Sequence, residues 1–538
     1  ATTLKKNNIT RLVPALRDEQ RIRRNLAGLN EVEKLAVGII HEQGDEMASD
    51  HLRSLLTHEG VLKTAPAAAK VFVGYRQVDW YEGNPHYKGQ PAYEDLMAGL
   101  ALKGLVLSRE PLRQDRGVIE WTPGQVLFIP AFIARHLPAA PAQPAGSLDK
   151  GEPPFVLPGS ARNFQRDLSH YARFLRRQKE LPLTSQGLVY KKTLKEVAAG
   201  LSFPVDLGSG KAEEENGRLF FLRRLLPHLG LAEAEWNRLL PSALDENFWK
   251  LGPSQRVQKT FETWRDGVVW NELRQLAYYE RGSDRTADAP PALSASRQAI
   301  LRHVKGLGSG WIRLPDLIAH IRRKDYGFLF AKRKYDSYGG WGRYNDSTPY
   351  SQSNNPLGMG FGGIQSEVDG WNKVEAGFIN HVIAGPLFWM GLVDLGYKGE
   401  PAADLNGTAP ALAYHLTDMG AWLLGLRGQV EISHQQSGGL VVQPNFEILV
   451  MEPIADEVLL VLDQFAESKG GDRVLTYELT RASVYRGQRH EWPVGRIIPY
   501  LESSAKQPLP ANVRRTLEEW EALHQRIIIR RRVNLAQT

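Results

Sequence analysis

A short pattern that occurs twice in the chain restricts the folds that it can adopt. A Gly-Leu-Val triplet at 104–106 follows a predicted helix and precedes a predicted β-hairpin, which leads into residues 121–127. The same order recurs at 391–393, where the hairpin leads into residues 416–424. Small helices followed by such a hairpin are typical of a winged helix, whose third helix and wing usually face nucleic acid. Because the plan repeats, we predict two winged-helix modules.

Length and two composition breaks divide the rest of the chain. A chain of 538 residues is too long for one ordinary core, and Pro-rich stretches interrupt it at 137–155 and 281–294. The expected fold class is mainly α with α+β parts, multidomain, with winged-helix modules followed by a small α+β C-terminal domain. We expect an N-terminal winged-helix domain at 1–136, a Pro/Ala-rich linker at 137–160, a helical, winged-helix-like domain at 161–280, a second winged-helix domain at 295–430 with a Gly/Tyr-rich insertion at 325–370, and an α+β domain at 431–538.

Composition excludes several classes of protein. The chain has no cysteine, which excludes disulfides, thiolate catalysis and every zinc site with Cys ligands. It shows no charged leader followed by an apolar stretch, and no apolar run of about 18 residues. We therefore expect neither secretion nor a membrane span.

Two short motifs resemble enzyme signatures but lack essential residues. The segment 208–211 reads Gly-Ser-Gly-Lys, yet Ala212 follows where a phosphate-binding loop needs Ser or Thr to hold magnesium. His41 and Glu42 begin like a zinc-binding helix motif, yet Asp45 occupies the place of the second His. We therefore expect no catalytic residue, no metal and no cofactor. An enzyme whose site is assembled from distant residues stays an open alternative.

The basic balance of the chain favours nucleic acid as a partner. The formal net charge is +7, and an excess of this sign suits phosphates when the cations cluster. The first predicted wing carries Arg109, Arg113 and Arg116. A guanidinium can donate two hydrogen bonds to one phosphate, so we predict DNA contact there, with solubility as the alternative role of an exposed basic hairpin.

Two helices carry further candidate phosphate-binding clusters. Lys191, Lys192 and Lys195 lie at the start of one predicted helix. Arg322 and Arg323 lie at the end of another, where cations also complement the helix dipole, so a structural role is the alternative there.

The 325–370 insertion combines cations and aromatic residues among Gly, Ser and Asn. Aromatic rings that stack on bases, together with cations along the backbone, hold single strands without sequence preference. The alternative is a flexible insertion that orders only against a partner protein. The candidate binding residues here are Lys332, Arg333, Lys334, Tyr335, Trp341 and Arg343.

The last hundred residues carry a family resemblance. The stretch GGLVVQPNFEILV at 438–450 predicts a hairpin, in which we assign turn roles to Gln443 and Asn445, and a helix follows it. Together with Tyr477-Glu478-Leu479-Thr480 and with residues 508–513 leading to Trp520, it resembles the domain at the N-terminus of XPB-type DNA helicases. That domain also ends many bacterial helicase-associated proteins, and a weaker likeness to them extends from about residue 163 to 532.

The resemblance implies a function without catalysis. In such helicases the domain lies beside the motor, helps to engage DNA and partner proteins, and hydrolyses nothing, whereas this chain shows no motor domains. We therefore expect a DNA-binding accessory or adaptor subunit that acts with a separate helicase or nuclease in DNA repair or phage defence. Its expected partners are DNA, duplex or single-stranded, and that helicase or nuclease; its expected location is the bacterial cytoplasm, near the nucleoid. The alternatives are a protein-interaction scaffold and a winged-helix transcriptional regulator.

Overall fold

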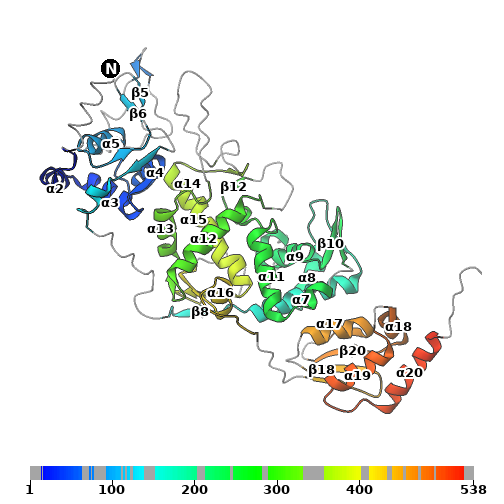
Figure 1. The fold of residues 1–538 in the computed structure, drawn as a ribbon. Helices are drawn as coiled ribbons and strands as arrows, with labels where there is room; N and C mark the ends of the chain where they lie inside the picture. The colour runs from blue at the N-terminus through cyan, green and yellow to red at the C-terminus, as the bar shows by residue number, and fades with distance from the viewer. Residues whose placement is uncertain are drawn as a thin grey trace, which may run out of the picture. The chain divides into compact units, whose positions relative to one another are not determined.

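The chain is mainly helical, carries several small antiparallel sheets, and divides into two compact units. In the computed structural model one unit comprises Ala1–Ser160 with Glu262–Gly428, and the other comprises Ala161–Phe261 with Gln429–Thr538. Figure 1 shows the elements of both. The fold class predicted from the sequence is confirmed. The structure describes residues 14, 16–62, 72–73, 76–77, 93–110, 113–115, 118–120, 125–138, 152–202, 213–242, 246–280, 289–330, 350, 357–400, 411–432, 439–451, 456–470, 474–489 and 492–525.

The first module, residues 19–134, contains a three-stranded sheet with strand order β1-β7-β4. Asn30 and Glu33 form a reciprocal capping box that begins α3, since each side chain accepts a hydrogen bond from the other residue's backbone N–H. The predicted hairpin is present, because β4 pairs with β7 and β5 with β6. Its elements are α2 (Glu19–Ala27), α3 (Glu31–Glu42), β1 (Glu46–Ala48), α4 (Ser49–His58), β2 (Phe72–Val73), β3 (Arg76–Gln77), α5 (Tyr93–Leu102), β4 (Leu107–Ser108), β5 (Arg113–Asp115), β6 (Val118–Glu120), β7 (Val126–Phe128) and α6 (Ala131–Ala134).

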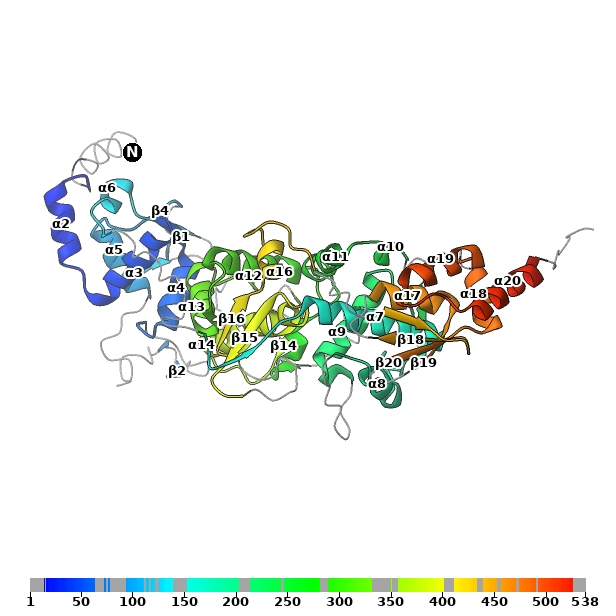
Figure 2. The ribbon, with the colours of Figure 1, turned by 90° about the horizontal axis from the view of Figure 1, so that it is seen from below.

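The later module, residues 293–423, repeats this order of elements in the same unit. Its sheet has the order β13-β16-β15-β8, and Figure 2 shows β15 and β16 side by side. The third helix kinks at Gly385-Pro386, since proline cannot donate a backbone hydrogen bond: the backbone of Gly385 is non-helical, with φ −100° and ψ −111°. The elements are α12 (Leu293–Leu307), β13 (Ile312–Arg313), α13 (Leu314–Lys324), α14 (Glu367–Gly370), η5 (Trp371–Glu375), α15 (Ala376–Val382), η6 (Ile383–Leu387), β15 (Val393–Tyr397), β16 (Ala413–Leu416) and α16 (Asp418–Leu423). The fourth strand, β8 (Phe155–Leu157), comes from an earlier part of the chain and pairs with β15.

Two further short elements, η4 (Glu272–Gln275) and β12 (Tyr279–Glu280), precede the later module in the sequence of the same unit. The strand β12 pairs with β14 (Gly360–Phe361), which lies inside the later module.

The middle module, residues 161–241, has the same order again, in the other unit. Helix, strand, two helices and a hairpin follow one another, and the sheet order is β10-β11-β9. Its elements are α7 (Ala161–Gln178), β9 (Leu181–Pro182), α8 (Lys191–Ala198), η3 (Glu213–Glu215), α9 (Gly217–His228), β10 (Ala232–Glu235) and β11 (Arg238–Pro241); α10 (Glu246–Trp249) and α11 (Pro253–Asp266) follow.

One glycine in each module ends the third helix in the same way. Gly104, Gly230 and Gly391 have φ of 71°, 74° and 74°, a left-handed conformation that costs glycine little. In each case the following leucine donates its backbone N–H to the carbonyl five residues earlier, as in a Schellman motif. The Gly-Leu pair therefore marks the same junction, from third helix to wing, in all three modules.

The terminal domain, residues 439–525, is a four-stranded antiparallel sheet with four helices. The sheet order is β17-β18-β20-β19, and the predicted hairpin is confirmed, because Val442 pairs with Ile448. Asn445 has the predicted turn role: its side-chain oxygen accepts the backbone N–H of Glu447, at 3.2 Å. The backbone N–H of Gln443 donates to the carbonyl of Glu447 across the same turn. The elements are β17 (Gly439–Val442), β18 (Glu447–Met451), α17 (Asp456–Phe465), β19 (Glu467–Gly470), β20 (Val474–Glu478), α18 (Arg481–Arg489), α19 (Val494–Ser504) and α20 (Ala511–Gln525).

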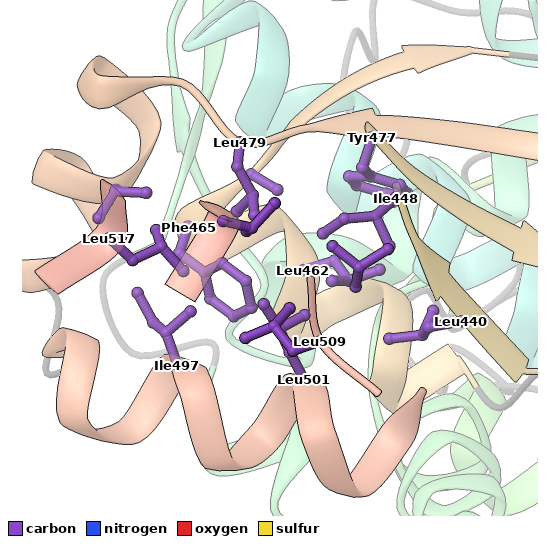
Figure 3. Close-up of a cluster of buried hydrophobic side chains, with 14 of the residues drawn as sticks. Leu440, Ile448, Leu462, Phe465, Tyr477, Leu479, Ile497, Leu501, Leu509 and Leu517 are labelled. Atoms are coloured by element: carbon purple, nitrogen blue, oxygen red, sulfur yellow. The ribbon is translucent and has the colours of Figure 1, made fainter. Parts of the chain in front are cut away.

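The core of the terminal domain forms between the sheet and these helices. Figure 3 shows side chains of the strands, such as Ile448, and side chains of the helices, such as Leu501, directed toward Leu462 and Phe465 of α17. The strands of the stretch at 438–450 therefore supply core residues, as their alternation predicts.

Candidate nucleic-acid interface

The three third helices offer little surface to a DNA groove. In the middle module α9 is buried along nearly its whole length, and its Arg218 and Arg223 donate to Asp167 and Glu213 inside the unit. In the later module, the helix from η5 to η6 is similarly buried. The exposed residues of α5 in the first module include Asp95 and Leu102, a poor match for phosphate. A candidate interface must therefore be sought on other elements.

The arginines predicted at the first wing are only partly described. Arg109 donates through its Nη2 to Glu46, and its guanidinium lies 5.6 Å from the centre of the Phe128 ring. The hydrogen bond to Glu46 raises the pKa of Arg109. Arg113 lies on β5, opposite Glu120 of β6, and Arg116 lies outside the described residues. Arg109 thus already has a carboxylate partner, and DNA contact by this wing stays a prediction.

Helix α8 presents the predicted lysine cluster to solvent. Lys191, Lys192 and Lys195 are exposed, whereas Leu194 and Val197 are buried, so the helix turns its apolar side inward. Tyr190 immediately precedes the helix and is 49% exposed. The structure therefore adds an accessible aromatic ring to three accessible cations, a combination suited to nucleic acid.

The cations at the end of α13 are held within their own unit. Arg323 forms two hydrogen bonds with the carboxylate of Glu42, at 2.5 and 2.9 Å. The Arg322 guanidinium lies 5.6 Å from the centre of the Trp371 ring. Burial, followed by the charge of Arg322, lowers the pKa of His58 to about 4. These contacts join α13 to α3 and to η5, which favours the structural role that the sequence left open.

Most of the insertion lies outside the described residues, and with it Lys332, Arg333, Lys334, Tyr335, Trp341 and Arg343. Tyr350, which the aromatic pattern of the insertion includes, is buried, and its hydroxyl donates to Glu375 at 3.1 Å. Gly370 leaves the room for its ring, since a Cβ there would lie 2.0 Å from Tyr350 Cε2. Tyr350 is therefore a core residue and cannot stack on a base.

The metal-like motif near residue 41 is used for local contacts. His41 Nδ1 lies 2.6 Å from Asp45 Oδ1, and Glu42 binds Arg323 as described above. Within the described ranges, no three His, Asp or Glu side chains are placed to hold a metal ion. The Gly-Ser-Gly-Lys segment at 208–211 lies outside those ranges.

Sequence patterns hardly indicate the exposure of Trp236, at the tip of the hairpin of the middle module. Trp236 is 89% exposed and separates the paired strands β10 and β11. Exposed Glu233 and Glu235 precede it, and Arg238 donates to Glu235 at 2.7 Å and to Glu180 at 3.2 Å. The alternation Ala-Glu-Ala-Glu-Trp before a short polar turn was the available signal. The tip therefore presents the large apolar side chain of Trp236 next to the acidic side chains of Glu233 and Glu235.

The terminal domain is also where a known family matches the chain. A family model described as "Helicase conserved C-terminal domain" matches residues 440–536, which begin in β17 and include every helix of the domain. The chain is helicase-related. No curated protein matches it.

The helicase-related domain is bonded to the middle module of its own unit. Arg173 of α7 donates through Nε to Asp463 of α17 and through Nη2 to the hydroxyl of Tyr477 on β20. The side chains of Arg173 and Asp463 are 11% and 8% exposed, and burial raises the pKa of Tyr477. The domain is therefore part of a larger folded unit, which also presents α8. In the part of the chain that the structure describes, every helix is too short or too polar to cross a membrane.

Proposed function

We propose that the chain is a non-catalytic, DNA-binding accessory or adaptor subunit that acts with a separate helicase or nuclease in DNA repair or phage defence. The observation that carries the proposal is the helicase-related domain at 440–536 in one folded unit with the exposed basic helix α8. By this proposal the domain corresponds to the N-terminal domain of XPB-type helicases, and the motor belongs to another chain.

The three modules support a role in binding nucleic acid. Each has the order helix, strand, two helices and a hairpin, and in each sheet the last strand lies between the first strand and the other strand of the wing. This is the arrangement expected of a winged helix, a fold that recurs in DNA-binding proteins. Because the third helices are largely buried, we assign the phosphate contacts to α8 and leave the first wing as a second candidate.

Replacing Lys191, Lys192 and Lys195 together with Ala should weaken DNA binding and reduce its salt dependence. Each phosphate that loses its cation lowers the slope of log affinity against log salt by about 0.9 on duplex DNA, so the slope should fall by about 2 to 3. Titrating labelled duplex and single-stranded DNA with the full chain over a salt series measures this. An Arg109/Arg113/Arg116→Ala variant tests the first wing in the same assay.

A matched control separates the local effect from net charge. Arg427, Arg514 and Arg515 are also exposed cations, and each lies beside a carboxylate, so their replacement with Ala likewise removes three positive charges. An equal loss in this control would mean that only net charge matters. If the unaltered chain binds no DNA at any salt concentration, the proposal is wrong.

The exposed Trp236 favours protein docking as a second activity of the same subunit. Tryptophan is one of the residues enriched among the energetic anchors of protein interfaces, whereas the neighbouring Glu233 and Glu235 would repel phosphates. The fitting partner is a protein with an apolar pocket edged by basic residues. Docking by this wing would give the adaptor its contact with the motor protein.

Trp236→Ala should release that partner without loss of folding. Losing an anchor costs about 2 kcal/mol or more, about 30-fold in affinity, while an 89% exposed side chain contributes little to stability. Co-purification of a helicase or nuclease with the tagged chain, followed by affinity measurement on the purified pair, tests this. Leu102→Ala, at an 83% exposed apolar position of the other unit, is the control. Equal retention by Trp236→Ala and the unaltered chain would exclude this docking role.

A further inference from the structure

We propose that the outer face of α18, in the helicase-related domain, binds a single strand of nucleic acid, with Arg481, Arg486 and Arg489 on its phosphates and Tyr485 stacked on a base. This inference rests on the proposed function and adds to it a second binding surface, distinct from α8 and from the first wing. The candidate residues of the sequence analysis include none of these four.

The face is formed by residues that share one side of the helix. Ala482, Tyr485, Arg486 and Arg489 line a groove on the surface, and their spacing of three, four and seven residues places them on one side of α18. The opposite side is buried and includes Ser483, Val484 and Gly487.

Tight packing fixes the orientation of this face. A Cβ at Gly487 would lie 2.7 Å from Cβ of Phe465, so α18 contacts α17 as closely as glycine permits. Ser483 and Thr480 also bond to each other at the start of the helix, since each backbone N–H donates to the other hydroxyl at 3.0 Å. The arginines and the tyrosine thus project from a rigid support, which lowers the entropic cost of binding.

Charge pairing distinguishes α18 from three other basic positions of the domain. Lys469 pairs with Glu478, Arg514 with Glu502 and Arg515 with Glu519. By contrast, α18 contains no acidic residue, and its three arginines form no ion pair with any described residue. Arg486 uses one N–H to donate to the carbonyl of Ala466, at 3.0 Å, which leaves its other donors for a ligand.

The helix dipole does not account for this set of arginines. Arg486 and Arg489 lie in the last turn, where a cation is favourable, but Arg481 is the first residue of the helix, where a cation is unfavourable. A bound phosphate near Arg481 would offset that cost and would also face the positive end of the dipole. All three arginines then have one common explanation.

Tyr485 favours a single strand over a duplex. Its ring is half-buried, and the Arg481 guanidinium lies 5.9 Å from the ring centre. Stacking on aromatic rings needs an unpaired base, which only a single strand presents. From Arg481 to Arg489 the helix rises about 12 Å, enough for the three cations to contact more than one phosphate of a strand that lies along it.

Two variants test the two kinds of contact in the full chain, with fluorescence anisotropy of a labelled oligothymidine over a salt series. Replacing Arg481, Arg486 and Arg489 with Gln should lower the slope of log affinity against log salt by about 2, at about 0.7 per phosphate on single strands. Tyr485→Leu keeps an apolar side chain in the groove. It should weaken binding about 5-fold to 150-fold and leave the salt slope unchanged.

The outcomes separate this inference from the proposed function. The control replaces Arg427, Arg514 and Arg515 with Gln and should bind as the unaltered chain does. If the unaltered chain binds nucleic acid and both α18 variants bind it as tightly as the unaltered chain does, the α18 site is wrong while the proposed function stands. An unlabelled duplex that displaces the oligothymidine as well as an unlabelled single strand does would overturn the single-strand assignment. If the unaltered chain binds no nucleic acid, both the α18 site and the proposed function are wrong.

Discussion

Replacement of Arg297 with Met is expected to destabilise the unit that contains it by about 3 to 5 kcal/mol, the cost of leaving a buried charge without its partner. Arg297 and Glu272 are both fully buried and paired, with Arg297 Nε 3.0 Å from Glu272 Oε1. The other Arg297 N–H groups donate to the carbonyls of Trp264, Gly267 and Trp270 and to Glu272 Oε2. Methionine fills much of the volume but satisfies none of these acceptors.

Hydrogen exchange of the backbone amides of α12 measures the effect. For amides that exchange only when the unit opens, a loss of about 3 kcal/mol or more makes exchange at least about 100-fold faster. Arg302→Met, at an exposed position of the same helix, is the control and should change little. Pairing Arg297→Met with Glu272→Leu should recover much of the loss, because it removes the orphaned carboxylate. A change below about 1 kcal/mol in the single variant would show that the buried pair contributes little.

Arg173→Met should loosen the helicase-related domain from the middle module, at a cost of about 3 kcal/mol. The change leaves Asp463, only 8% exposed, without its cation and removes a donor from the Tyr477 hydroxyl. Faster exchange should therefore extend through α7, α17 and β20 together. The matched control is Arg177→Met, one turn further along the same helix at an exposed position.

The double variant Arg173→Met/Asp463→Leu distinguishes charge from packing. Recovery in the double variant would show that the unpaired carboxylate is the main cost. If exchange in α17 stays unchanged when Arg173 alone is replaced, the two parts are held together by apolar contacts and not by this pair.

The repeated order of elements could be predicted as a repeat where the local pattern is strong, and only as a helical, winged-helix-like domain at 161–280 where the pattern is weak. Gly104 and Gly391 are each followed by Leu-Val and a long hairpin, so the echo is visible in the sequence. Gly230 is followed by Leu-Ala and by a hairpin whose strands, β10 and β11, are four residues each. The third junction has the same backbone geometry, but its β-propensity signal is weaker.

The candidate sites show that sequence patterns do not predict which side chains are exposed and unpaired. Arg323 looked like a free cation because its carboxylate partner, Glu42, lies 281 residues away in the sequence. Tyr350 lies in a stretch rich in Ser and Asn, a composition that is typical of exposed loops, while its burial depends on Gly370 and Glu375. Conversely, the α18 face was missed because Arg481, Arg486 and Arg489 do not adjoin one another in the sequence, and only the packing of the helix shows that they share a surface. Exposure and pairing are tertiary properties, so local composition cannot supply them.

The hydrogen bond between Arg173 and Asp463 determines when, during synthesis, the unit that contains it can be completed. The two residues are 290 positions apart, and at about 5 to 20 residues per second a ribosome needs about 15 to 60 s to make the chain between them. During that interval the guanidinium on α7 lacks Asp463 and Tyr477 as partners, and the chain that emerges meanwhile includes residues 293–423. The unit with the helicase-related domain can thus be completed only after the neighbouring unit's sequence has left the ribosome. A shortened chain that begins at 429 lacks Arg173 altogether, and should therefore be a less stable object than the same domain in the full protein.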